Sequence, residues 1–223
     1  MKTTLKKLFA VGMAAAVIGT ASACSAAGPS KASSGSSTVS GSVSGASGTS
    51  TAGKKVTVGV IQYAPHPSLD NCYKGFKAGL AEAGYTEGKN LTIDFQNAQA
   101  DNGSSDLMAK NMVSKKYDMI MTIATPAAMS AFSAARNTDI PVVYTAVSDP
   151  VAAQLASSLE KPGNNCTGSS DVLPLEAQIK MIRAFLPKAK KIGVLYTTSE
   201  VNSVSDLKVF KSLAPKYGFE VVD

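Results

Sequence analysis

The feature that most constrains the fold is the regular alternation of strand-like and helix-like segments from Lys54 to the last residue. Runs rich in β-branched and apolar residues alternate with segments whose apolar residues recur every three or four positions. The predicted strands are 55–62, 90–96, 117–124, 140–147, 166–172, 191–196 and 219–222. One predicted helix starts after Ser68, and a second starts after Ser104 or Ser105. Three more are predicted at 126–136, 175–185 and 204–217, and 151–159 is predicted to be a short helix or a turn.

Strict alternation of strands and helices predicts an α/β fold, a parallel sheet with helices on both faces. Right-handed crossovers place the loops that follow the strands at the carboxyl edge of the sheet. Ligands of open α/β sheets bind at that edge. We therefore expect a binding site in the loops that follow Gln62, Ala124, Val147, Val172 and Tyr196.

Motifs for nucleotide binding and catalysis are missing from these loops. No GxxxxGK[ST] follows any predicted strand, and no GxGxxG follows the first one. No GxSxG nucleophile elbow occurs, and a Ser–His–Asp triad would depend on His66, the only histidine. Without CxxC spacing or a histidine cluster, a zinc site is not expected. The sequence predicts no catalytic residue, no cofactor and no metal site.

Small polar residues fill the loops instead. They are Thr125-Pro126, Ser148-Asp149-Pro150, Ser169-Ser170-Asp171 and Thr197-Thr198-Ser199. Hydroxyls, carboxylates and backbone N–H groups hold small polar solutes, and a helix N-terminus favours a carboxylate. The same residues are common as caps and turns, so at any single loop the two interpretations have equal weight. Several such loops at one edge favour a binding site.

The first 23 residues have the pattern of a secretory signal peptide. Three lysines among the first seven residues precede an uncharged run of 16, Leu8–Ala23, which is short for a membrane span. Small residues then lead to Cys24, which resembles a bacterial lipobox, although Ala21 stands where a larger aliphatic residue is usual. The pattern predicts lipidation of Cys24 and an anchor on the extracytoplasmic face of the cell membrane. The alternative is a plainly secreted protein.

The segment 24–53 fits a tether behind that anchor. Of the 29 residues at 25–53, 25 are Gly, Ser, Thr or Ala, a composition that forms a flexible coil. A long Ser/Gly tether behind a lipidated cysteine is similar to those of Gram-positive bacteria.

The net charge of +6 gives no evidence for a nucleic-acid partner. Four of the 22 basic residues precede Lys54 and no acidic residue precedes Asp70, so residues 54–223 carry 18 basic and 16 acidic side chains. With Cys24 assigned to lipid, Cys72 and Cys166 remain. An exported pair can form a disulfide, but we favour two small, buried apolar residues.

Five blocks of the sequence resemble the substrate-binding proteins of ABC importers, in particular the family associated with tryptophan and tyrosine uptake. The blocks are VGVIQYAPHPSLDNCYKGFKAGLAEAGYTEGKN (58–90), TIATPAAMSA (122–131), IPVVYTAVSDPVAAQL (140–155), NNCTGSSD (164–171) and KKIGVLYTTSEVNS (190–203). The run from Ile61 to Asp70 and the VSDPVAA block are the more specific. The resemblance extends over essentially all of 54–223.

The resemblance implies a type I periplasmic-binding fold, in which two α/β lobes close on a ligand. Lobe I is expected at 54–172, and 173–223 is the start of a lobe II that looks truncated. Because a lone β-α-β fragment cannot cover both faces of its sheet, apolar surface is expected to remain exposed there. The implied ligand is an amino acid, often aromatic, and the implied partner is an ABC permease.

The resemblance also implies which residues line the cleft: Gln62, His66, Thr125, Ala127, Ser148 and Asp149 from lobe I, and Tyr196, Ser199, Glu200 and Asn202 from lobe II. Thr125 and the N–H of Ala127 at a helix start suit an α-carboxylate, and Asp149 suits an α-ammonium. Tyr196 suits stacking on an aromatic ring. The structural alternatives are a hydrogen bond within the loop for His66 and a cap of the segment at Pro150 for Asp149.

Other functions stay open at this stage. A sugar- or nucleoside-binding protein can have the same fold, because fold does not fix function. An exported enzyme would need a nucleophile–base pair or a metal cluster, and the sequence offers neither. A gene remnant without function is favoured only by the abrupt end of the chain.

Overall fold

The computed structural model describes residues 55–223. The predicted signal peptide, Cys24 and the Ser/Gly tether lie outside the described residues. Within the described part of the chain, none of the helices has the length and apolar character needed to cross a membrane.

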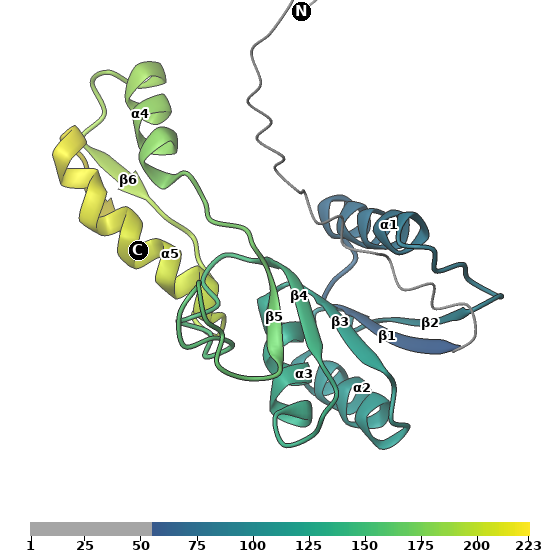
Figure 1. Ribbon diagram of the computed structural model, residues 1–223. Coiled ribbons are helices and arrows are strands. Elements are labelled where there is room, and N and C mark those ends of the chain that lie inside the picture. Colours follow the sequence, from purple (N-terminus) through teal and green to yellow (C-terminus); the bar gives the residue numbers. More distant parts are fainter. Residues whose placement is uncertain (1–54) are drawn as a thin grey trace, which may run out of the picture. The chain divides into compact units, whose positions relative to one another are not determined.

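Five parallel strands form the main sheet in the order β2-β1-β3-β4-β5 (Figure 1). They are β1 (Val56–Gln62), β2 (Leu91–Asn97), β3 (Met119–Ile123), β4 (Val142–Val147) and β5 (Cys166–Ser170). The central strands β1 and β3 are almost wholly buried, as expected of a parallel sheet covered on both faces. The predicted parallel sheet with flanking helices is confirmed.

Three helices cover the two faces of this sheet. Helix α1 (Pro67–Glu82) packs on one face, against Val58 and Val60. Helices α2 (Asn102–Ser114) and α3 (Thr125–Ala135) pack on the other face (Figure 1). The helix α2 begins earlier than predicted, because its cap is Asp101 and not Ser104 or Ser105. The side chain of Leu107 on this helix is 70% exposed. The buried face of α2 contains Ser105, Ala109 and Met112, of which the first two are small residues that let α2 approach α3 closely.

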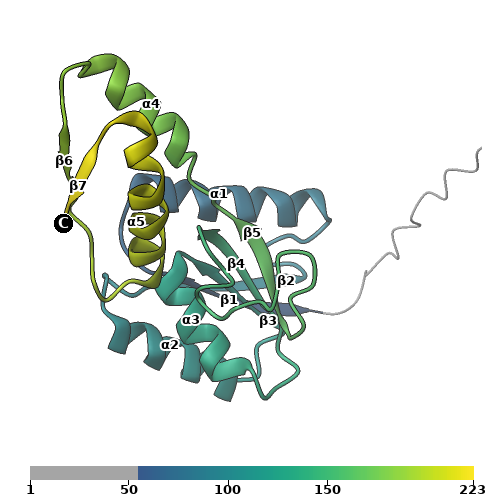
Figure 2. The same ribbon diagram turned by 90° about the vertical axis from the view of Figure 1, so that its left-hand side faces the viewer.

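A smaller group of elements follows β5. It consists of α4 (Leu175–Phe185), β6 (Lys191–Gly193), α5 (Val201–Leu213), the short 3₁₀ helix η1 (Ala214–Tyr217) and β7 (Glu220–Val222). The strands β6 and β7 pair in parallel, with α4 and α5 beside them (Figure 2). Strand β6 is shorter than predicted because β7 offers it only three partners. Residues 151–159 form turns, one of the two predicted alternatives.

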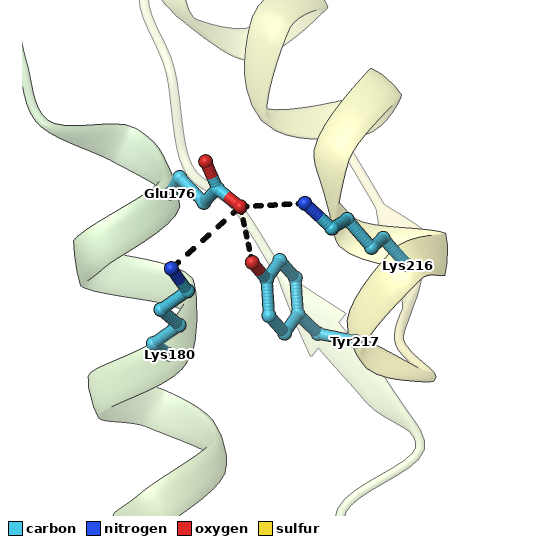
Figure 3. Close-up of polar contacts among 4 residues, drawn as sticks. All are labelled: Glu176, Lys180, Lys216 and Tyr217. Atoms are coloured by element: carbon cyan, nitrogen blue, oxygen red, sulfur yellow. Dashed lines mark hydrogen bonds and ion pairs between the residues drawn. The ribbon is translucent and has the colours of Figure 1, made fainter.

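Polar side chains fasten α4 to η1. Glu176 accepts hydrogen bonds from Tyr217 and, at 2.8 Å, from Lys216, and it pairs with Lys180 at 3.7 Å (Figure 3). The hydrogen bonds from Lys216 and Tyr217 are the main reason that the pKa of Glu176 falls to about 2. Arg183 adds six hydrogen bonds to the carbonyls of Leu186, Pro187, Ala189, Tyr217 and Gly218.

The two cysteines of the domain are free thiols. Cys166 is buried in the main core, and desolvation raises its pKa to about 12. Cys72 is half-buried on α1. The interpretation that we favoured from the sequence, a buried apolar residue, fits Cys166, whereas Cys72 is only partly buried.

Candidate functional site

Seven of the predicted site residues line three cavities, Gln62 and His66 lie at the loop that follows β1, and Ala127 lines none of these cavities. The first, which we call the interlobe cavity, has a volume of about 300 Å³. It is lined by Asn102, Asp106, Thr125, Pro126, Met129, Ser130, Ser133, Ser199, Glu200 and Val201. The main sheet with its three helices is called the first lobe below, and the smaller group of elements that follows β5 is called the second. The structure therefore brings Thr125 of the first lobe together with Ser199 and Glu200 of the second.

The start of α3 contributes partial positive charge to the interlobe cavity. No side chain caps this helix, and Pro126 in its first turn has no N–H to donate. The N–H of Ala127 lies in the same turn, where a helix offers no acceptor. The methyl group of Ala127 is buried in the core, so this residue can meet a ligand only through its backbone. A carboxylate fits such a helix start.

The backbone before α3 is strained. Ala124 has a φ of 84° and a ψ of 155°, a conformation that is costly for any residue but glycine. Its N–H donates to the carbonyl of Thr145 on β4, and its carbonyl accepts from the N–H of Ala128. These two bonds hold the strained residue in place and fix the direction of the first turn of α3. Strain of this kind is common where a ligand is held.

Two carboxylates stand in the wall of the interlobe cavity, Glu200 and Asp106. Asp106 accepts a hydrogen bond of 2.5 Å from Ser130. Glu200 lies close enough to Tyr63 to help raise the pKa of its hydroxyl, although desolvation is the larger cause. The cavity therefore contains both carboxylates and an uncapped helix start, which are groups that suit the two charged ends of a zwitterion.

Asn102 and Asp106 were missed by the sequence reasoning. The reason is that we placed the start of α2 at Ser104 or Ser105. The side chain of Asp101 accepts from the N–H of Ser104 at 2.7 Å, which is an ordinary N-cap. An Asp three positions before that serine was the signal for a helix that begins at Asn102.

Ser148 and Asp149 lie in a second cavity, of about 260 Å³, together with Ser205 and Asp206 of α5. Ser148 donates to Asp206 at 3.2 Å, and Ser205 donates to Asp149 at 2.6 Å. Asp149 also accepts from the N–H of Ala152 at 2.8 Å, so the capping role considered for it is present.

Tyr196 and Asn202 line a third cavity, of about 330 Å³, between α4 and α5. The side-chain oxygen of Asn202 is buried there without a hydrogen-bond partner among the described residues. Neither residue lines the interlobe cavity in this structure.

Gln62 and His66 organise the loop after β1. Gln62 is fully buried, and its amide donates to the carbonyl of Ala64 at 2.9 Å and to Asp70 at 2.8 Å. His66 is exposed, and its Nδ1 accepts from the N–H of Ser68 at 3.2 Å. His66 is therefore the N-cap of α1, whereas we predicted Ser68 as the cap. The difference arises because Pro67 starts the helix two residues earlier.

Among residues 55–223, no group of three or more His, Cys, Asp or Glu side chains is placed to hold a metal ion.

Comparisons with known proteins agree with this architecture. The family described as ABC transporter substrate binding protein matches residues 57–223. The "Tyrosine-binding protein" of Clostridioides difficile (strain R20291) is 46% identical over 170 residues, which are 76% of this chain and 49% of that protein. The chain thus spans about half the length of that relative.

Two solved structures extend the comparison. The first is the ABC domain from Streptococcus pneumonia in complex with L-Trp, at 41% identity and a TM-score of 0.72 over 76% of this chain and 56% of that one. The second is the ligand-free, open structure of CD0873, a substrate binding protein from Clostridium difficile. It is 45% identical to this chain, with a TM-score of 0.60 over 75% of this chain and 56% of that one. The fold is that of type I periplasmic-binding proteins, and the chain belongs to the family of ABC transporter substrate-binding proteins.

Proposed function

We propose that this protein is the extracytoplasmic solute-binding component of an ABC importer and that it binds an amino acid without chemical change. The observation that carries the proposal is the interlobe cavity, which joins the uncapped start of α3 to the carboxylate of Glu200. One relative is described as tyrosine-binding, and another was solved with L-Trp. An aromatic amino acid is therefore the favoured ligand.

In the proposed complex, the α-carboxylate lies at the start of α3, near Thr125 and the N–H of Ala127. The α-ammonium pairs with Glu200 or Asp106, since both carboxylates line the same cavity. Asp149 remains a proposed contact for the ammonium, although Ser205 and Ala152 already donate to it. A volume of about 300 Å³ lies at the lower end of the usual range for small-ligand sites.

The remaining parts of the proposal concern location and partners. Lipidation of Cys24 would anchor the protein to the cell membrane, and the tether would let the domain reach an ABC permease. The signal peptide and anchor can be tested by mass spectrometry of the mature N-terminus. An unlipidated mature protein would overturn the anchor and leave the binding function standing.

Binding is tested by calorimetry and thermal shift on the full chain in mild detergent, with L-tyrosine, L-tryptophan, L-leucine, a sugar panel and a nucleoside panel. A ligand at 100 times its Kd stabilises the native state by about 2.7 kcal/mol. We expect a shift with aromatic amino acids, at least a tenfold weaker affinity in Glu200→Gln, and no change in the exposed control Glu82→Gln. Binding of sugars or nucleosides alone would favour the alternative ligand class, and sustained turnover of any solute would contradict a binding protein.

A further inference from the structure

Two reciprocal hydrogen bonds join the loop after β4 to helix α5. Ser148 donates to Asp206, and Ser205 donates to Asp149, at 3.2 and 2.6 Å. Each partner is thus a Ser-Asp dipeptide, and the two dipeptides lie 56 to 58 residues apart in the sequence. We call this arrangement the Ser–Asp junction.

The backbone of β4 is distorted just before the junction. The register with β5 shifts between Tyr144 and Val147, and Ala146 has a φ of 55°. A bulge of this kind re-aims the residues that follow it. Ser148 and Asp149 are the next residues in the chain, and both meet α5.

The surroundings of the junction are mostly aliphatic. The cavity around it is otherwise lined by Pro150, Val151, Leu159, Val172, Leu173, Leu175 and Val209, with no basic side chain. Desolvation raises the pKa of Asp206, and the nearby carboxylates Asp149 and Asp171 raise it further. In such surroundings a hydrogen bond to a carboxylate contributes more than it would in water. Without Ser205, Asp149 would keep only its hydrogen bond from the N–H of Ala152 among those of the described residues.

The junction lies one helical turn from the interlobe cavity. Ser199, Glu200 and Val201 line that cavity, and α5 begins at Val201. The hydroxyl of Ser203 accepts from the N–H of Thr197, which ties the preceding loop to the same helix. The hydrogen bonds that hold Ser205 and Asp206 against the first lobe therefore also hold Glu200 beside the interlobe cavity, which includes the start of α3.

We propose that the Ser–Asp junction is a latch for the closed arrangement of the lobes, and that Ser205 and Asp206 are positioning residues that increase ligand affinity without touching the ligand. The junction joins the loop after β4 to the helix that follows Glu200, so moving the lobes apart would separate its hydrogen-bonding partners. The latch favours the closed state before the ligand arrives. Less of the ligand's binding free energy is then needed to close the lobes.

The test compares Ser205→Ala with Ser212→Ala in the full chain. Ser212 lies on the same helix but is exposed, and it donates to the carbonyl of Val209 within the helix. Calorimetry with L-tyrosine and L-tryptophan gives Kd, stopped-flow gives the dissociation rate, and hydrogen exchange of the ligand-free chain reports on 147–153 and 196–206. We expect Ser205→Ala to bind about tenfold more weakly through faster dissociation, with faster exchange in both segments, while Ser212→Ala stays like the wild type. Ser205→Thr, which keeps the hydroxyl, is expected to restore affinity.

The inference rests on the proposed function, and the two fail differently. Unchanged affinity in Ser205→Ala, beside a wild type that binds, would overturn the latch and leave the binding function intact. No binding by the wild type would overturn the proposed function. If the wild type does not bind, hydrogen exchange still tests the junction. Unchanged exchange in Ser205→Ala would show that the junction does not hold 147–153 and 196–206 together, whereas faster exchange in both segments would support it.

Discussion

The two lobes keep their shape by different means. In the first lobe, five strands are covered on both faces, and the central strands have nearly continuous runs of buried residues. In the second, the strands β6 and β7 have three residues each and are exposed at both ends. Of the fifteen exposed large apolar side chains among the described residues, ten lie from Val172 onward.

The difference shows where each lobe obtains its stability. The main core fills both faces of the sheet, whereas the second lobe buries only Ile179, Ala214 and Phe219 in its cluster. Partly buried side chains such as Ile182 and Phe210 pack against it, but the cluster is still smaller than the main core. The polar contacts of Arg183 and Glu176 therefore make up a larger share of the stability of the second lobe. The apolar exposure expected for a β-α-β fragment is present in 173–223.

The largest effect is expected from a single methyl group in the first lobe. A Cβ on Gly168 would stand 2.1 Å from the carbonyl oxygen of Tyr144, whereas a Cβ on Gly193 of β6 meets nothing within 4 Å. We expect Gly168→Ala to lower the free energy of unfolding by about 3 kcal/mol and Gly193→Ala to leave it within about 0.5 kcal/mol. Urea unfolding measures both. Equal losses would mean that the two strands are equally tightly packed.

The second largest effect tests the polar stabilisation of the second lobe. The guanidinium of Arg183 donates six hydrogen bonds and lies 3.7 Å from the centre of the Phe219 ring. Arg183→Ala should cost about 2 kcal/mol, and Arg183→Lys nearly as much, since an ammonium cannot reproduce the planar donor set. Lys188→Ala, at an exposed position nearby, is the control. Urea unfolding measures these changes as well. An unchanged free energy of unfolding in Arg183→Ala would show that the small apolar core is enough to stabilise the second lobe.

A smaller effect follows from pH. The pKa of Glu176 is lowered from 4.5 to about 2 in the folded protein, so folding favours its ionised form. Its contribution to stability is therefore present above pH 4.5 and disappears as the pH falls towards 2. We expect the urea midpoints of the wild type and Glu176→Gln to differ at pH 6 and to converge near pH 2. A difference that persists at pH 2 would contradict this assignment.

The smallest effect is expected at Leu195, which is fully exposed. Leu195→Ser should change the free energy of unfolding by less than about 0.5 kcal/mol. Leu155 is fully buried in the first lobe, so Leu155→Ser serves as the contrast and should cost about as much as Gly168→Ala, roughly 3 kcal/mol. A large loss at Leu195 would show that this side chain packs against something in solution.

The sequence predicted the order of elements well, since most of them have strong periodicity. The helix at 175–185 begins and ends at the predicted residues. Errors concern boundaries, as at Asp101, where a cap lay three residues before the serine that we chose. The cavity partners Asn102 and Asp106 were missed for that reason. The second-lobe residues Tyr196 and Asn202 could not be separated from Ser199 and Glu200, because neighbours in a loop can face different cavities.

The sequence by itself determined the α/β class, the parallel sheet and the edge at which polar loops gather, because these depend on local periodicity and on the handedness of crossovers. Only the tertiary structure decided which polar groups meet. The pairing of Ser148 with Asp206 and of Asp149 with Ser205 depends on the bulge in β4 and on where α5 packs. Contacts between residues more than fifty positions apart are set by packing, which no local pattern records.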